Sequence, residues 1–251
     1  VEGSVDPLRD LTTIETELLL ADLESMERRV QSLEKKIKAN DAEAKALLPI
    51  LQKVLKALQA GQSAKSVPLA NEEKPFFQQL QLLSSKSILY VCNVEESQAA
   101  TGNKYTQAVA DYAKKQGAQA VIISAAIEAE VASLESASEQ QEYLQSLGLQ
   151  ETGLKQVIRA GYHLLNLLTF FTVGPKEARA WTVHQGAKAP QAAGVIHSDF
   201  EKGFICAETV AYEDYITYQG EQGAKNAGKL RQEGRDYAVK DGDIFHFRFN
   251  V

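Results

Sequence analysis

The chain has 251 residues, of which 44% are hydrophobic and 24% charged, and its formal net charge is −6. This composition is that of an ordinary soluble globular protein, and no apolar run is long enough to span a membrane. The first residues lack the basic and apolar regions of a secretory signal, and the chain begins at Val1 rather than Met, which permits a fragment of a longer protein.

The charge is unevenly distributed. Residues 24–56 carry eight Lys and Arg against five acids, whereas residues 93–151 carry nine acids and three Lys. A basic region on an acidic body is not typical of a general nucleic-acid binder, but it could contact phosphates. A solvated helix surface would have the same composition, so both interpretations remain open.

Two heptad-like seams in the first third predict an antiparallel pair of helices. The polar sequence KANDAE separates the seams, and Asn40 with Glu43 predicts a capping box for the second helix. Pro49 either bends that helix or lies in its first turn. The seam residues are Leu19, Leu23, Met26, Val30, Leu33 and Ile37, then Leu47, Leu51, Val54 and Leu58.

A parallel β-α-β unit is expected next. Residues 87–92 (SILYVC) predict a strand buried on both faces, residues 104–116 a helix that Gly117 ends, and residues 119–124 a second strand. Two parallel strands need neighbours for their faces and edges. We therefore expect part of this domain to be missing on the N-terminal side.

The last hundred residues change from helix to strand. Residues 150–169 predict a long packing helix, and four strand-like stretches follow it. A short helix with Pro190 at its start interrupts them, so we expect a small mixed sheet with one helix against it. The strand-like stretches are FFTVG (170–174), ARAWTV (178–183), FICAETVAY (204–212) and DIFHFRFNV (243–251).

The loops after the two parallel strands are the candidate binding site. Ligands bind at the carboxyl ends of parallel strands, where Asn93 and the sequence Ser124-Ala125-Ala126 both lie. Asn-x-x-Asp is a guanine-reading pattern, but here the acid is Glu96 and the following lysine is Val94. These changes weaken a guanine site and favour a purine site for adenine, although a plain polar turn would also fit.

No other pattern predicts catalysis or a metal site. Cys92 and Cys206 are expected to be free thiols rather than a disulfide. Ser124 has no histidine base near it in sequence, so we assign no catalytic residue. No zinc site is expected, because none of the histidines has metal-ligand spacing to a cysteine; they are His163, His184, His197 and His246.

Several long segments resemble the YchF, or Obg-like ATPase, family, whose members are P-loop NTPases of the TRAFAC class. The resemblance covers essentially the whole chain and is most specific toward its C-terminus. The segments are DPLRDLTTIETELLLADLESMERR, LYVCNVEE, LQETGLKQVIRAGYHLLNLLTFFTVGPKEARAWTV, GAKAPQAAGVIHSDFEKGFICAETVAYEDY and GEQGAKNAGKLRQEGRDYAVKDGDIFHFRFNV.

The resemblance implies an α/β fold in three parts. Residues 1–70 would be a helical coiled-coil hairpin with a flanking segment, inserted in a partial Rossmann-like parallel sheet. Residues 71–168 would be the C-terminal part of the nucleotide-binding domain, and residues 169–251 an α+β, ubiquitin-like β-grasp (TGS) domain. In the family the Asn-x-x-Glu loop accompanies a preference for ATP; Asn93, Val94, Glu96 and Ser124-Ala125-Ala126 match the two base-contacting loops.

The resemblance also implies cofactors and partners: ATP with Mg²⁺, the ribosome (its large subunit or the whole 70S particle) and RNA, in the cytoplasm. No membrane and no specific DNA sequence is expected as a partner. One departure is large, because G-x-x-x-x-G-K-[ST] and the family's switch motifs occur nowhere in these residues. We therefore expect this chain alone to lack ATP hydrolysis and to contain no Mg²⁺ ligand.

Two hypotheses follow. The first is that the chain is the C-terminal portion of a ribosome-associated ATPase that acts when its P-loop region is present. The second is a non-catalytic adaptor that binds ribosome, RNA or protein partners without nucleotide. Candidate RNA contacts are Arg28, Arg29, Lys35, Lys36 and Lys38 in the helical pair, and Lys225, Lys229, Arg231 and Arg235 near the C-terminus.

Overall fold

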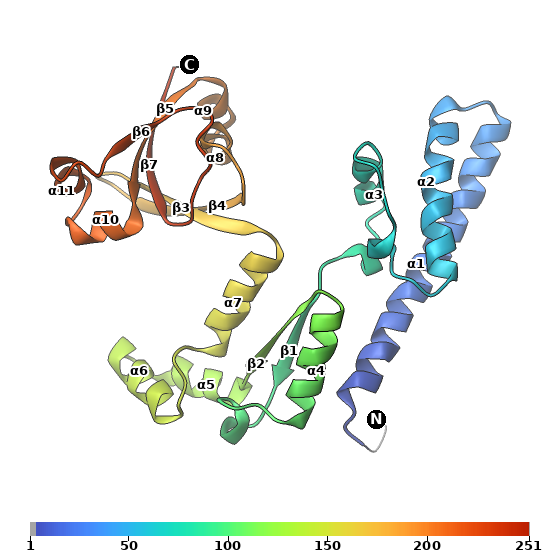
Figure 1. The fold of residues 1–251 in the computed structure, drawn as a ribbon, viewed down its shortest axis with the longest axis horizontal. Coiled ribbons are helices and arrows are strands. Elements are labelled where there is room, and N and C mark those ends of the chain that lie inside the picture. Colours follow the sequence, from blue (N-terminus) through green and yellow to red (C-terminus); the bar gives the residue numbers. More distant parts are fainter. Residues whose placement is uncertain (1–3, 251) are drawn as a thin grey trace. The chain divides into compact units, whose positions relative to one another are not determined.

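A computed structural model describes residues 4–250 of the chain, which divides into two compact units, one ending at Gly153 and one beginning at Leu154 (Figure 1). The start of the predicted helical segment, residues 1–3, and Val251 of the last predicted strand lie outside the described residues. Between residues 4 and 250, no helix is both long and apolar enough to cross a bilayer.

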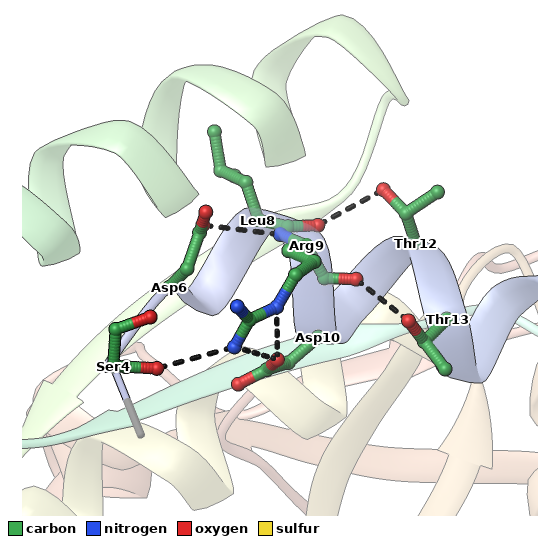
Figure 2. A network of polar contacts seen from close by, with 7 residues as sticks. All are labelled: Ser4, Asp6, Leu8, Arg9, Asp10, Thr12 and Thr13. Carbon is green, nitrogen blue, oxygen red and sulfur yellow. Dashed lines mark hydrogen bonds and ion pairs between the residues drawn. The ribbon is translucent and has the colours of Figure 1, made fainter. Parts of the chain in front are cut away.

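Helix α1 (Pro7–Lys38) begins well before the heptad seam. Asp6 is its N-cap and accepts a hydrogen bond from the backbone N–H of Arg9 at 3.2 Å, and Pro7 fills the first turn, where a missing N–H costs nothing. The Arg9 side chain bonds the carboxylate of Asp10 and the carbonyl of Ser4, each at 3.1 Å (Figure 2). These local contacts fix where the helix begins.

Helix α2 (Ala42–Gln59) follows α1 after a short turn, and its cap differs from the predicted one. The N-cap is Asp41, whose side chain accepts from the N–H of Ala44 at 3.0 Å, so the predicted capping box of Asn40 and Glu43 is wrong. Asn40 instead has φ 66° and occupies the turn itself. Asn tolerates this left-handed conformation better than most residues, which explains the shift by one position.

Pro49 lies inside α2, which continues from Ala42 to Gln59. The alternative in which the regular helix begins near Leu48 is therefore wrong. The two helices lie side by side and share an apolar core that includes Met26, Val30 and Val54 (Figure 1). These are seam positions, so the predicted pairing of two amphipathic helices is confirmed at the level of their contacts.

Three short elements follow the helical pair, in a segment that contributes to its core: η1 (Ala64–Ser66), α3 (Lys74–Gln79) and η2 (Leu83–Ser85). The buried carboxylate of Asp22 on α1 holds η2 in place. It accepts hydrogen bonds from the N–H of Leu83 at 2.9 Å and from both the N–H and hydroxyl of Ser84 at 2.7 Å. A buried carboxylate requires such donors, so this contact joins α1 to a segment about sixty residues later.

The β-α-β unit forms as predicted. Strands β1 (Leu89–Asn93) and β2 (Gln119–Ile123) are parallel, and α4 (Lys104–Lys115) connects them after the one-turn helix η3 (Glu96–Gln98). Burial of β1 on both faces is wrong: Tyr90 is 7% exposed, but Val91 is 45% exposed. In the described residues this sheet has two strands, and α4 and α1 cover the Tyr90 face.

Three helices follow β2. The first two are α5 (Ala125–Ser133) and α6 (Ala137–Ser146), and neither was predicted. The third, α7, spans Gly153–Leu164, so the predicted helix over 150–169 is too long. Its apolar pattern continues past Leu164, but Asn166 has φ 51° and ends the helix, and residues from Leu167 pair with two other strands.

The second unit contains a five-stranded mixed sheet in the order β4-β3-β7-β5-β6, which confirms the predicted sheet type. Strands β3 and β7 are parallel and the other pairs antiparallel. The short strand β6 was not predicted. The strands are β3 (Leu167–Val173), β4 (Ala178–His184), β5 (Phe204–Ala211), β6 (Arg231–Glu233) and β7 (Asp243–Phe249).

Four short helices accompany this sheet, rather than one. Alanines of α8 pack on one face with Phe170, Phe245 and Phe247, whose rings contact one another edge-on or tilted. The predicted alternation in the last strand is confirmed, because His246 and Arg248 are exposed between the buried phenylalanines. The helices are α8 (Ala189–Ile196), α9 (Ser198–Lys202), α10 (Tyr212–Thr217) and α11 (Glu221–Asn226).

Candidate functional site

The two predicted loops meet at the carboxyl edge of the parallel sheet. Asn93 and Ile123, the last residues of β1 and β2, are partners in the register. The Asn93 side chain accepts a hydrogen bond through Oδ1 from the N–H of Ala125 at 3.0 Å, and the N–H of Val94 donates to the carbonyl of Ile123 at 2.9 Å. We call these bonded residues, 93–94 and 123–125, the loop clasp.

Ser124 lies in the centre of the loop clasp with an unused hydroxyl. It is only 3% exposed, it is the N-cap of α5, and its Oγ has no hydrogen-bond partner among the described residues. A buried hydroxyl without a partner costs about 1–3 kcal/mol. A ligand that supplied this partner would recover that free energy, which makes Ser124 a better candidate than its sequence context indicated.

Ala125 and Ala126 occupy the first turn of α5 and are exposed. Backbone N–H groups in the first turn of a helix have no partner within it. One of these groups, that of Ala125, is used by Asn93. The small side chains leave the backbone of this turn open to a ligand.

An open hollow of about 570 Å³ lies against β1 next to the loop clasp. Its walls include the exposed Val91, the half-buried Val94 and, at the start of α4, Asn103 and Tyr105. This volume lies within the range of small-molecule sites, about 300–1,000 Å³. Val94 therefore contributes an apolar surface at the position where a guanine reader has lysine.

Glu96 takes no part in the hydrogen bonds of the loop clasp. It is the first residue of η3, is exposed, and forms no hydrogen bond with Asn93 in the described part of the chain. Partial burial of Tyr143, followed by the carboxylates of Glu96 and Glu130, raises the pKa of the Tyr143 phenol. Glu96 thus lies close enough to α6 to act on Tyr143.

Gly153 lies against Ile123 of the loop clasp. The sequence analysis did not select Gly153 as a site residue. Its N–H donates to the Glu128 carboxylate at 2.6 Å, and a Cβ at this position would lie 2.7 Å from Cγ2 of Ile123. A methyl group does not fit at that distance, so glycine is required at position 153 beside Ile123. A glycine in the first turn of an amphipathic helix was the available sequence signal.

The basic residues of the helical pair are exposed. Arg28 forms a 3.6 Å ion pair with Glu24 one turn away, and both side chains are 71% exposed. Such a pair contributes little to stability. The other candidates have no ion-pair partner among residues 4–250; they are Arg29, Lys35, Lys36 and Lys38.

The C-terminal basic group is mostly engaged within its own unit. Lys229 pairs with Asp214 at 3.5 Å, and the guanidinium of Arg235 donates to the Phe204 carbonyl at 2.8 Å. Arg231 lies 3.7 Å from the buried carboxylate of Asp243, across the ring of Tyr237. Lys225, on α11, is exposed and forms no such pair in the described chain.

Both cysteines are free thiols, as predicted. Burial raises the pKa of the Cys92 thiol, so this side chain behaves as a small apolar residue of β1. Neither cysteine belongs to the loop clasp, and no redox role follows from their positions.

The geometry defines an α/β protein with one parallel and one mixed sheet, whose loops meet at a sheet edge. The family model YchF-GTPase_C, described as "Protein of unknown function (DUF933)", matches residues 167–250. "Ribosome-binding ATPase YchF" of Haemophilus influenzae is 53% identical over 251 residues, which are 100% of this chain and 69% of that protein. The protein of the same name from Bacillus subtilis is 49% identical over 253 residues, with the same coverage.

A solved structure is similar as well. The Schizosaccharomyces pombe YchF GTPase superposes with a TM-score of 0.82 at 36% identity, over 99% of this chain and 68% of that one. The chain therefore belongs to the YchF family, and it spans about two thirds of the length of these relatives.

Proposed function

We propose that this chain is part of a ribosome-binding ATPase and that the loop clasp receives the adenine base of ATP. The relatives named as ribosome-binding ATPases support the general activity. The observation that carries the site is the bond from Ala125 to Asn93 beside the buried, unpartnered hydroxyl of Ser124.

The base preference rests on hydrogen-bond chemistry. Guanine presents ring and exocyclic N–H donors that a paired aspartate accepts, whereas adenine presents an acceptor at N1 and a single amine. Glu96 carries its carboxylate one methylene further from the backbone than the aspartate of a guanine reader, and Val94 offers an apolar surface, so neither residue favours guanine. Because the S. pombe relative is named a GTPase and the bacterial relatives ATPases, both nucleotides must be compared.

Phosphate and Mg²⁺ are assigned to no residue of this chain. The pattern G-x-x-x-x-G-K-[ST] does not occur in its sequence, and that loop supplies the amides and lysine that hold the phosphates. We propose hydrolysis for a form of the protein that carries such a loop, with this chain contributing base recognition and ribosome contact in the cytoplasm.

The family's parts are proposed to map onto the chain as follows. Helices α1 and α2 form the coiled-coil hairpin within residues 1–70, and residues 71–168 complete the nucleotide-binding domain. Residues 169–251 form the TGS, or β-grasp, domain; the mixed sheet with α8 against one face supports this assignment.

Exchange of the loop residues tests the proposed base preference. In a form with the full length of the relatives, Val94→Lys with Glu96→Asp should raise GTP affinity relative to ATP by at least about tenfold, because a site built for hydrogen-bond donors then exists. Fluorescent-nucleotide competition measures the ratio. Glu95→Asp, a change at the neighbouring exposed acid, is the control and should leave the ratio unaltered.

Ribosome contact is proposed for the end of α1. Lys35→Glu with Lys36→Glu should weaken co-sedimentation with ribosomes several-fold and make binding less dependent on salt, because fewer phosphate counterions are released. The matched control is Lys114→Glu with Lys115→Glu, a lysine pair in the last turn of α4. An equal loss of ribosome binding in both double variants would indicate general charge attraction rather than a specific contact at α1. Ribosome binding that no nucleotide alters would favour the adaptor hypothesis.

A further inference from the structure

We propose that Glu208, Glu221 and His246 form a binding site for a divalent transition-metal ion, with Zn²⁺ as its best fit. A ligand oxygen of each carboxylate and a ring nitrogen of the imidazole all lie within 4.8 Å of one another. Within residues 4–250 this is the one group of three or more such side chains with that spacing. The site goes beyond the proposed nucleotide and ribosome functions.

Three elements of the second unit bring these residues together. Glu208 on β5 and His246 on β7 are direct partners in the antiparallel register, so their side chains share one face of the sheet. Glu221 is the first residue of α11. The three side chains border a small cavity of about 10 Å³, which is the space of about one water molecule.

The potential ligands are available for binding. In the described chain, neither the Glu221 side chain nor the His246 side chain has a hydrogen-bond or ion-pair partner. Glu208 accepts from the Arg248 guanidinium at 3.0 Å through Oε2 only, which leaves Oε1 for an ion. The two carboxylates repel each other at this separation, and a divalent cation between them would replace that repulsion with attraction.

The donor set favours Zn²⁺ over the common hard cations. Zn²⁺ takes imidazole nitrogen and carboxylate oxygen at about 2.0–2.2 Å, so tetrahedral ligand atoms lie about 3.3 Å apart. Glu221 and His246 are exposed and can close from the present spacing by rotation of their side chains. Three protein ligands leave a fourth position for water, whereas Mg²⁺ and Ca²⁺ prefer oxygen ligands alone.

Metal binding would fasten α11 to the sheet. α11 carries Lys225, and Lys229 follows shortly after it, so the ion would order a basic segment of the second unit. No sequence motif indicated this site, because its ligands are separated by 13 and 25 residues on three different elements. The expectation that no zinc site exists rested on the spacing of cysteines and histidines and left out the two glutamates.

Calorimetric titration of ZnCl₂ into the metal-stripped 251-residue chain tests the site. We expect one ion per chain. His246→Asn and Glu221→Gln should each weaken Zn²⁺ binding by at least about tenfold. Loss of a residue that only orients a metal ligand already lowers metal affinity by about that factor, and loss of a direct ligand should lower it at least as much. His184→Asn, at an exposed histidine of β4 in the same unit, is the matched control. Circular dichroism verifies that each variant is folded.

Two further measurements make the result decisive. Co²⁺ in place of Zn²⁺ should give a visible absorption band typical of a low-coordinate site, and the band should disappear in His246→Asn but persist in His184→Asn. Zn²⁺ should also raise the melting temperature of the unaltered chain and not that of Glu221→Gln. No Zn²⁺ binding, equal loss in the His184 control, or equally tight Mg²⁺ binding would each overturn the proposal.

Discussion

At the scale of single residues, the buried carboxylate of Asp243 organises the second unit. It accepts hydrogen bonds from the Tyr237 hydroxyl at 2.9 Å and from the N–H of Lys240 at 2.8 Å, and Arg231 lies 3.7 Å away. Burial, and then the bond to Asp243, raises the pKa of Tyr237 to about 12, although Arg231 acts in the opposite direction.

This shift predicts a loss of stability in alkali. Between the ordinary tyrosine pKa of about 10 and about 12, the unfolded chain releases a phenolic proton that the folded chain retains at Tyr237. The free energy of unfolding therefore falls as pH rises through this window. Below pH 10 the stabilisation is fully present.

Tyr237→Phe tests this account. At neutral pH it should lower the free energy of unfolding by about 1–3 kcal/mol, because buried Asp243 loses a donor. Between pH 10 and 12 the variant should lose less stability than the unaltered chain. Urea unfolding at a series of pH values measures both effects, with the exposed Tyr218→Phe as control. An identical pH dependence in all three chains would contradict the assignment.

The residues of the loop clasp could be selected from sequence, but their roles could not. Asn93 and Ser124 each follow an apolar strand, and the rule that ligands bind at the carboxyl edge pointed to both. The bond from Ala125 to Asn93 and the unpartnered Ser124 hydroxyl depend on side-chain rotamers. Sequence also placed Glu96 in the same group, and its part in base contact stays a prediction.

At the scale of elements, Gly153 packs against Ile123, the last residue of β2. Gly153→Ala should lower the free energy of unfolding by about 1–3 kcal/mol through overpacking against Ile123, since its Cβ would lie 2.7 Å from Cγ2 of that residue. The displaced Ile123 should also disturb the adjoining Ser124. Thermal or urea unfolding measures the first effect, and amide exchange at residues 123–126 measures the second.

Gly161→Ala in the same helix is the matched control. Apart from its two neighbours and the backbone of its own helix, no atom of the described residues lies within 4 Å of the position that a methyl group would take at Gly161. The change should therefore stabilise the chain by about 0.5–1 kcal/mol through helix propensity alone. If both alanine variants changed stability in the same direction, packing at Ile123 would not be what requires glycine at 153.

Element type followed from periodicity, whereas element ends depended on single residues and tertiary contacts. The seam residues Met26 and Val54 predicted two packed helices, and the structure places both in one core. The apolar pattern after Leu164 suited a helix equally well, but strand pairing with β4 and β7 decides the outcome there. Helices α5 and α6 were missed although Ser136 and Glu139 form a capping box that the sequence already contained.

At the scale of the whole molecule, the proposed activities occupy separate parts of the chain. The loop clasp and the basic end of α1 belong to the first unit, and the proposed metal site belongs to the second. Because the chain spans about two thirds of its relatives' length, the full reaction is proposed for a longer form. Base recognition is the step that we propose for this chain's own residues.

The most direct measurement is a calorimetric titration of ATP and GTP into a form with the full length of the relatives. We predict that ATP binds more tightly by at least about tenfold, a difference of about 1.4 kcal/mol, because Val94 and Glu96 replace the lysine and aspartate of a guanine reader. Equal affinities, or tighter binding of GTP, would contradict the proposal that the loop clasp selects adenine.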